Sequence, residues 1–252
     1  MTRAADRWLP FTPHPSPLAR LRVFCFPYAG GSALAYRPWL KKLPAGIEVC
    51  PVELPGRAAR LSQPAFDRSG PLADAVTTAL LPYLDRPFAL FGHSMGSLVA
   101  FEVARRLRDR HGREPLALIV SGRNAPQVPH NDVFTHTLND ADLVRRLRHL
   151  NGTPPEVLAH PELLELLLPL LRADFAVSET HVHEPCEPFR VPLVAFGGDR
   201  DPEMDPGGLE AWQAHAAGPF RLHVFPGDHF FLHARQDDVL RTLGRELLDL
   251  LG

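Results

Sequence analysis

The sequence predicts an α/β fold, with a mostly parallel central sheet flanked by helices. Short apolar runs recur along the 252 residues, helix-like segments alternate with them, and each run is apolar at nearly every position. Strands that helices cover on both faces have this near-continuous hydrophobicity, whereas strands with one exposed face alternate between apolar and polar residues. Regular alternation of strands and helices implies parallel pairing through right-handed crossovers.

Six apolar runs are the expected strands of this sheet. Two of the intervening segments have helical patterns: Pro71–Leu84 is periodic, and Ser97–Arg110 is apolar on one face and rich in arginine on the other. We expect these helices to cover the sheet. The six runs are Leu21–Phe26, Ile47–Val52, Phe88–Phe91, Leu116–Val120, Leu193–Phe196 and Leu222–Phe225.

The interval between Val120 and Val191 departs from this alternation. It contains two helix-like segments, Asp140–Leu150 and Pro161–Phe175, and no convincing strand. So long a departure indicates a helical insertion above the sheet, at about residues 126–188, within one domain that spans residues 1–252. Leucines make Pro161–Phe175 apolar nearly all round, so this segment is either a buried helix or a lid that offers apolar surface to a substrate.

The composition excludes several classes of protein. A formal net charge of −2 leaves no basic excess for binding nucleic acid or an anionic membrane. Cys25, Cys50 and Cys186 are too few and too widely separated for a disulfide framework or a clustered metal site. Met1–Pro17 has proline and charges where a signal peptide is apolar, and no apolar run approaches the ~20 residues that span a bilayer. We therefore expect a cytoplasmic protein with no nucleic-acid or membrane partner, and a monomer, since nothing demands an oligomer.

The segment Gly92–Gly96 (GHSMG) fits the pattern G-x-S-x-G. It follows the expected strand Phe88–Phe91 directly and opens the expected helix, as a nucleophile elbow requires. In such a strained turn the flanking glycines avoid collisions with neighbouring backbone, and the helix N-terminus directs free amides at developing negative charge. We therefore predict that Ser94 is a nucleophile rather than an ordinary serine in a strand-to-helix turn.

A serine hydroxyl needs a base to remove its proton, and His229 is the best candidate among the 13 histidines. It lies in a glycine-containing loop directly after the last apolar run, and loops after parallel strands meet at the active-site edge of an α/β sheet. His223 lies inside that run and His233 lies beyond the loop, so both are weaker candidates.

The acid that orients this base is expected after the preceding strand, where two carboxylates occur, Asp199 and Asp201. Asp201 is preferred because hydrolases of this architecture usually present G-x-x-D there, and Gly198 lies three residues earlier. Asp199 is the reserve candidate, and its alternative role is to stabilise a turn. The chain order Ser94, Asp201, His229 is the order of the α/β-hydrolase fold.

Two backbone N–H groups are expected to form an oxyanion hole. One belongs to Met95, the residue after the nucleophile, and the other to Ala29 in the glycine-containing loop Pro27–Ser32. Without a nucleophile elbow in the same chain, this loop would be an ordinary turn. We expect further substrate contacts from Tyr28, His93, Phe175 and Phe230.

His181 and His183 lie in the insertion and raise the question of a metal site. Two histidines without a nearby cysteine or paired carboxylates are more typical of a loop. We expect neither a metal nor another cofactor.

Several segments of the chain resemble those of type II thioesterases, the discrete α/β-hydrolases that accompany modular polyketide synthases and nonribosomal peptide synthetases. Phe91–Gly96 is similar to the family's nucleophile segment, and Gly227–Phe231 resembles its G-x-H-F-F, with Asp228 at the variable position. His181 stands where an aromatic residue, often tyrosine, is expected from the family. The resemblance covers almost the whole chain. It also includes Cys25–Ser32 (F-P-x-A-G-G-S), Glu53–Arg57 (x-L-P-G-R), and two segments similar to lid sequences, Gly152–Pro154 and Leu171–Phe175.

This resemblance implies hydrolysis of acyl thioesters from the phosphopantetheine arm of acyl or peptidyl carrier proteins. It also implies that the leucine-rich insertion forms a lid with an acyl groove. Arg57 either neutralises a carboxylate or phosphate or is structural, as arginines in Pro-Gly loops more often are. A general carboxylesterase or lipase would have the same triad and stays open as an alternative. A non-catalytic ligand-binding protein on the same scaffold is a further one.

Overall fold

A single six-stranded sheet runs through the protein. The computed structural model describes residues 7–12, 16–129 and 134–252; residues 1–6 and 13–15 of the N-terminal stretch and residues 130–133 of the expected insertion lie outside the described residues. The strand order is β2-β1-β3-β4-β5-β6, and every neighbouring pair is parallel. The strands are β1 Leu21–Phe26, β2 Ile47–Pro51, β3 Phe88–His93, β4 Leu118–Ser121, β5 Leu193–Gly198 and β6 Phe220–Phe225.

The predicted α/β fold class is confirmed, and the strands agree closely with the six apolar runs. The largest differences are of two residues: β4 begins at Leu118 rather than Leu116, and β6 at Phe220 rather than Leu222. Likewise, β3 ends at His93 rather than Phe91, and β5 at Gly198 rather than Phe196. Strands β1 and β3 are buried at every position, as expected for strands covered on both faces. Arg22 in β1 is buried as well, and it is compensated by an ion pair with Glu48 at 2.8 Å.

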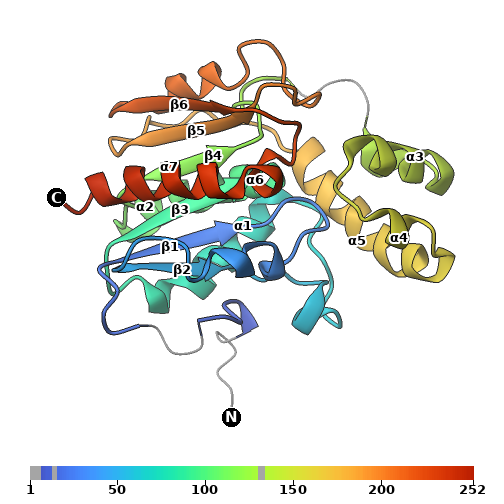
Figure 1. The fold of residues 1–252 in the computed structure, drawn as a ribbon, viewed down its shortest axis with the longest axis horizontal. Coiled ribbons are helices and arrows are strands. Elements are labelled where there is room, and N and C mark those ends of the chain that lie inside the picture. The colour runs from blue at the N-terminus through green and yellow to red at the C-terminus, as the bar shows by residue number, and fades with distance from the viewer. Residues whose placement is uncertain (1–6, 13–15, 130–133) are drawn as a thin grey trace.

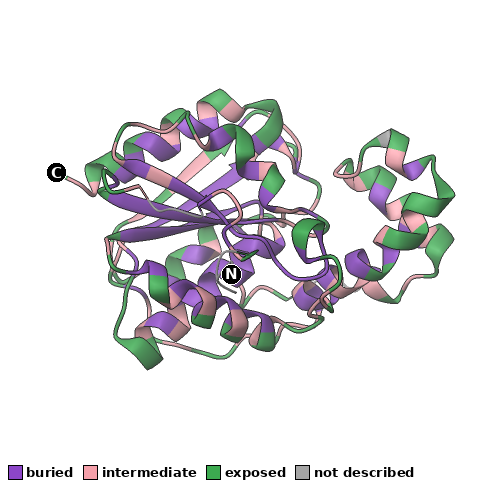
Figure 2. Cartoon of the chain, turned by 90° about the horizontal axis from the view of Figure 1, so that it is seen from below, coloured by how far each residue is buried: buried purple, intermediate pink, exposed green. Residues whose placement is uncertain are grey.

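Helices cover both faces of this sheet (Figures 1 and 2). Successive residues of a strand point to opposite faces. Accordingly, Phe24 and Phe26 of β1 share one core cluster with the two helices that precede and follow β3, whereas Val23 and Cys25 share another with the C-terminal helix. The helices of these layers are α1 Ser69–Leu80, α2 Met95–His111, α6 Phe231–Ala234 and α7 Gln236–Asp249. The 3-10 turns are Ala33–Trp39, Ala58–Arg60, Leu81–Tyr83, Thr135–Thr137 and Glu210–His215.

Between β4 and β5 the chain forms a helical projection at one end of the sheet, with α3 Asp140–Leu150, α4 Pro155–Leu158 and α5 Pro161–Glu179 (Figure 1). The sequence predicted that the leucine-rich helix α5 is either buried or a lid with exposed apolar surface, and the structure fully matches neither prediction. One side of α5 packs with leucines of α3 and α4 in a small hydrophobic cluster, while Leu166 on another side is 67% exposed. A membrane-spanning segment is absent from the described helices, none of which combines the length and hydropathy that a bilayer requires. The small cluster consists of Leu143, Leu147, Leu158, Leu168 and Leu171.

Candidate active site

Ser94 occupies a strained turn between β3 and α2. Its backbone has φ 54° and ψ −119°, a conformation that a residue with a side chain rarely adopts. The glycines on either side are required by close packing. A Cβ on Gly92 would lie 2.0 Å from the carbonyl oxygen of Gly96, and one on Gly96 would lie 2.1 Å from that of Phe26. The turn therefore brings α2 directly against the end of β1, with Ser94 at its apex.

His229 and Asp201 meet at the carboxyl ends of β6 and β5. Nδ1 of His229 donates to Oδ2 of Asp201 at 2.8 Å, and both side chains are buried. The other oxygen of Asp201 accepts the backbone N–H of Glu203 at 2.9 Å, which fixes the carboxylate. This contact uses Nδ1 of the imidazole, so Nε2 is the nitrogen available to a reacting group.

The reserve candidates lie elsewhere. Asp199 accepts the backbone N–H of Gly227 and is half exposed, so it stabilises the turn before His229. His223 contacts Glu246 of α7 at 2.9 Å, and His233 contacts the hydroxyl of Tyr28 at 3.0 Å. The structure thus pairs Asp201 with His229. The reserve acid and the two weaker histidine candidates have other partners.

The two expected oxyanion donors both have free N–H groups. Met95 is the first residue of α2, and its N–H has no acceptor among the described residues. The same holds for Ala29 after β1. The next N–H, that of Gly30, donates to Oδ2 of Asp174 at 2.7 Å and is occupied. Gly30 is thereby excluded as the second oxyanion donor, whereas the N–H of Ala29 stays available.

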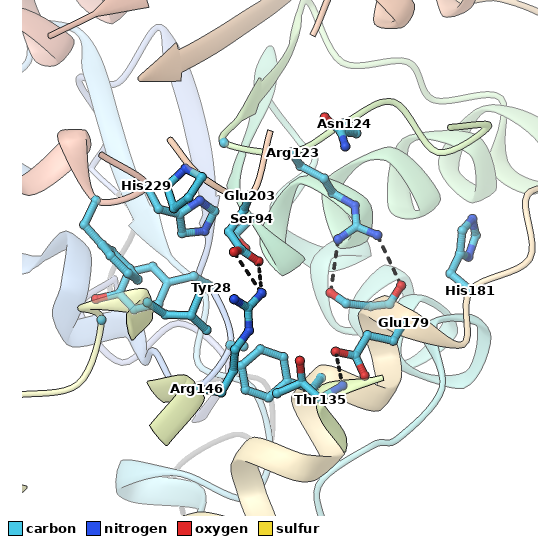
Figure 3. Close-up of a pocket in the computed structure, with 18 of the residues that line it drawn as sticks. Tyr28, Ser94, Arg123, Asn124, Thr135, Arg146, Glu179, His181, Glu203 and His229 are labelled. Carbon is cyan, nitrogen blue, oxygen red and sulfur yellow. Dashed lines mark hydrogen bonds and ion pairs between the residues drawn. The ribbon is translucent and has the colours of Figure 1, made fainter. Parts of the chain in front are cut away.

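Ser94 and His229 line a cavity of about 420 Å³ (Figure 3). Three of the four predicted substrate contacts, Tyr28, Phe175 and Phe230, also line it. The ring of Phe230 meets that of His229 edge to face, with centroids 5.1 Å apart. Insertion and core thus share this cavity.

The prediction that His93 contacts substrate is contradicted by its position, since the side chain is fully buried and is not among the residues lining the cavity. Its Nδ1 is 2.8 Å from Oγ of Ser121, and its ring lies 5.1 Å from that of His229. Burial, reinforced by the nearby His229, lowers the pKa of His93 well below its usual range. His93 therefore packs behind the base as a neutral ring.

Polar groups from the insertion and core form the opposite wall of the cavity (Figure 3). Arg123, directly beyond β4, donates to the hydroxyl and carbonyl oxygens of Ser178 at 3.1 and 3.2 Å. Burial lowers the pKa of Arg123 to about 10, against the opposing effect of Glu179. Two further lining residues form an ion pair: Nη2 of Arg146 on α3 contacts both carboxylate oxygens of Glu203, at 2.8 and 2.6 Å.

His181 lines the same cavity and is 3.0 Å from Oγ of Ser69. Burial lowers the pKa of His181 to about 4, so its imidazole is neutral near pH 7. His183 packs against the ring of His215, with centroids 5.2 Å apart. In the part of the chain that the structure describes, no group of three or more His, Cys, Asp or Glu could hold a metal ion.

Comparison with known proteins identifies the family. Residues 21–247 match the family described as a thioesterase domain. Linear gramicidin dehydrogenase LgrE of Brevibacillus parabrevis is 44% identical over 98% of this chain and 94% of its own length. Thioesterase PikA5 of Streptomyces venezuelae is 38% identical over 95% of this chain and 85% of its own. The chain belongs to the thioesterase family.

The fold agrees with this assignment. RedJ, a thioesterase from the prodiginine biosynthetic pathway of Streptomyces coelicolor, superposes with a TM-score of 0.86 at 39% identity, covering 94% of this chain and 98% of RedJ. The resemblance predicted from the sequence motifs is thereby confirmed.

Sequence reasoning missed one part of this thioesterase-family site. Arg57, whose role was left open, forms a bidentate ion pair with Asp174 of α5, with N–O distances of 2.8 and 2.7 Å. Asp174 was not a candidate residue. An acid in a largely apolar helix nevertheless carried a signal, because a buried carboxylate requires a partner. The basic residue of the Pro-Gly loop is that partner.

Proposed function

We propose that this protein is an editing thioesterase that hydrolyses acyl groups from the phosphopantetheine arm of acyl or peptidyl carrier proteins. The observation that carries the proposal is the buried Asp201–His229 pair, which shares a cavity with Ser94 at the apex of a strained elbow. Family membership supports the thioester as the bond cleaved. The relatives' names, which refer to gramicidin and prodiginine biosynthesis, support a carrier-bound substrate.

In the first step, Nε2 of His229 takes the proton of the Ser94 hydroxyl as its oxygen attacks the thioester carbon. The N–H groups of Met95 and Ala29 donate to the oxygen that becomes negative. Asp201 stabilises the imidazolium through Nδ1. As the C–S bond breaks, His229 returns the proton to the pantetheine sulfur, leaving an acyl ester on Ser94.

In the second step, His229 removes a proton from water as the water oxygen attacks this ester. The same two N–H groups hold the second oxyanion, and His229 then protonates the oxygen of Ser94 as the free acid leaves. The neutral ring of His93 places no fixed positive charge beside the base, so His229 can accept a proton in both steps.

We propose that the helical insertion is the lid over this cavity. It contributes Leu147 and Leu150 from α3 and Leu171 from α5, and these apolar residues line the same cavity as the polar residues Arg123 and Thr135. Such a mixed surface suits short or functionalised acyl groups better than long alkyl chains, because a long chain would bury polar groups without partners.

One relative's name, linear gramicidin dehydrogenase, raises a dehydrogenase as an alternative. Dinucleotide-binding α/β proteins carry the glycine pattern G-x-G-x-x-G after the first strand. Here the loop after β1 reads PYAGGS, and no two glycines in the chain are separated by a single residue. The sequence therefore lacks that fingerprint, while it has the full set of groups that hydrolysis needs.

The test is turnover of acyl-carrier proteins by wild type and by Ser94→Ala. We expect Ser94→Ala to lower kcat at least 10⁴-fold, since removal of one triad member disables the unit. Ser62→Ala, at an exposed serine, serves as the control and should retain wild-type turnover. Retained turnover in Ser94→Ala would refute the mechanism. Faster hydrolysis of a matched oxygen ester would favour a general esterase, and failure of a fluorophosphonate to label Ser94 would favour a binding protein.

A further inference from the structure

Asp174 of α5 contacts the oxyanion loop directly. Its Oδ2 accepts the backbone N–H of Gly30 at 2.7 Å, and the side chain is only 1% exposed. Gly30 has φ +72°, and a Cβ there would lie 2.6 Å from Cδ2 of Leu171, the α5 residue one turn before Asp174. The backbone of this loop therefore packs directly against helix α5 of the insertion.

Two further hydrogen bonds orient the peptide that carries the expected oxyanion donor. The N–H of Ala29 belongs to the same peptide group as the carbonyl of Tyr28, and that carbonyl accepts the N–H of Gly31 at 2.9 Å. The carbonyl of Gly31 in turn accepts Nη1 of Arg57 at 2.9 Å. Because a peptide group is planar, fixing the Tyr28 carbonyl fixes the direction of the Ala29 N–H.

The side chain of Arg57 connects this loop to helix α5. Its guanidinium binds both oxygens of Asp174 and the carbonyl of Gly31, while Nε donates to the carbonyl of Pro55 at 3.2 Å. One buried ion pair thus joins three parts of the chain: the loop after β1, the loop after β2 and helix α5. Removing α5 from its seat would leave the Gly30 N–H without its acceptor and Arg57 without its counter-charge.

We propose that Asp174 is a positioning residue for the oxyanion hole, and that its contacts make the alignment of the Ala29 N–H depend on the seating of α5. This inference rests on the proposed function. It has a mechanistic consequence: the enzyme stabilises the transition state fully only while α5 is seated on the core.

Two nearly isosteric substitutions test the role of the Gly30 hydrogen bond. Asp174→Asn keeps an oxygen that can accept from Gly30, whereas Asp174→Leu removes it, and both remove the ion pair with Arg57. We expect Asp174→Leu to lower kcat about 100-fold and to change KM less than threefold, because loss of an oxyanion donor acts on the transition state. Asp174→Asn should lower kcat by tenfold or less.

The decisive readout is inhibitor affinity. A trifluoromethyl ketone analogue forms a tetrahedral adduct on Ser94 with a negatively charged oxygen, whereas the corresponding amide mimics only the bound substrate. Asp174→Leu should weaken the ketone by about the factor lost in kcat and the amide less than threefold. Equal weakening of both ligands, or unchanged ketone affinity, would overturn the proposal in favour of a structural role. Titration of Ser94 with a fluorophosphonate corrects for any inactive fraction.

If the unpaired charge of Arg57 prevents folding, the same two substitutions are compared in an Arg57→Met background, where no charge is stranded. The expected ratio between the Asn and Leu variants is unchanged, and a ratio near one overturns the proposal. Failure of the proposed function is distinguishable, since it appears as absence of thioester hydrolysis in the wild type.

Discussion

Among the ion pairs that join the insertion to the core in the described residues, one comes from helix α5 and one from helix α3, and these two differ in burial and in their further contacts. Arg57–Asp174 is 5% and 1% exposed and includes backbone contacts to Gly30 and Gly31. The second pair, between Arg146 of α3 and Glu203, is 29% and 28% exposed, and both residues line the cavity.

Because the two ion pairs differ in burial, breaking them should cost different free energies. Removing one member of a buried pair leaves the other charge in a medium that solvates it poorly, whereas water and salt replace a lost partner at the surface. The α5 end of the insertion is therefore held strongly and the α3 end weakly. In this arrangement the α3 end can be released while the α5 end, which contacts the oxyanion loop, stays in place.

The largest expected effect comes from Arg57→Met. It strands the Asp174 carboxylate, so we expect a loss of about 3–5 kcal/mol in the free energy of unfolding, measured by urea denaturation. The matched control is Arg57→Met combined with Asp174→Leu, which strands no charge and should recover most of that loss. A cost below about 1 kcal/mol for the single variant, the range of surface pairs, would remove the distinction between the two attachments.

An intermediate effect is expected at Gly152, where the insertion touches the aromatic group beside the base. A Cβ at this position would lie 2.3 Å from Cζ of Phe230, whose ring packs against His229. Gly152→Ala should therefore cost about 1–3 kcal/mol of stability, as overpacking does, and lower kcat/KM about tenfold by displacing the ring.

Gly70→Ala is the control for this substitution, because the nearest atom to a Cβ there is the end of a flexible arginine at 3.7 Å. Thermal unfolding and kcat/KM are measured for both variants. If Gly152→Ala matched the control in both measurements, the insertion would not be closed on Phe230 in solution.

The sheet and the groups at its carboxyl edge could be predicted from the sequence, whereas the ion pairs that hold the insertion could not. The strands and the groups placed at their carboxyl ends followed from apolar runs and from the order of Ser94, Asp201 and His229, because parallel strands bring those ends together. The helix α7 was missed, although Val239, Leu240, Leu243 and Leu247 repeat at helical spacing and pack in the core.

The role of the Arg57–Asp174 pair could not be predicted. Its members lie 117 positions apart, and neither local pattern nor strand order indicates that they meet. The role of His93 was misassigned for a similar reason. It was expected to contact substrate, but successive residues of a strand end point in opposite directions, and the ring lies behind the base.

The smallest expected effect is that of Arg146→Gln. The pair with Glu203 is part-exposed, so its loss should cost no more than about 1 kcal/mol, and the cost should shrink as ionic strength rises from 0.05 to 0.5 M. Urea denaturation at both salt concentrations measures it, with Arg57→Met as the control whose cost should change little with salt. Because both residues line the cavity and their pair joins α3 to the core, weakening it should also ease substrate entry and raise the association rate of a fluorophosphonate with Ser94. A salt-independent cost near that of Arg57→Met would show that both ends of the insertion are held alike, and the α3 end could then not serve as the opening.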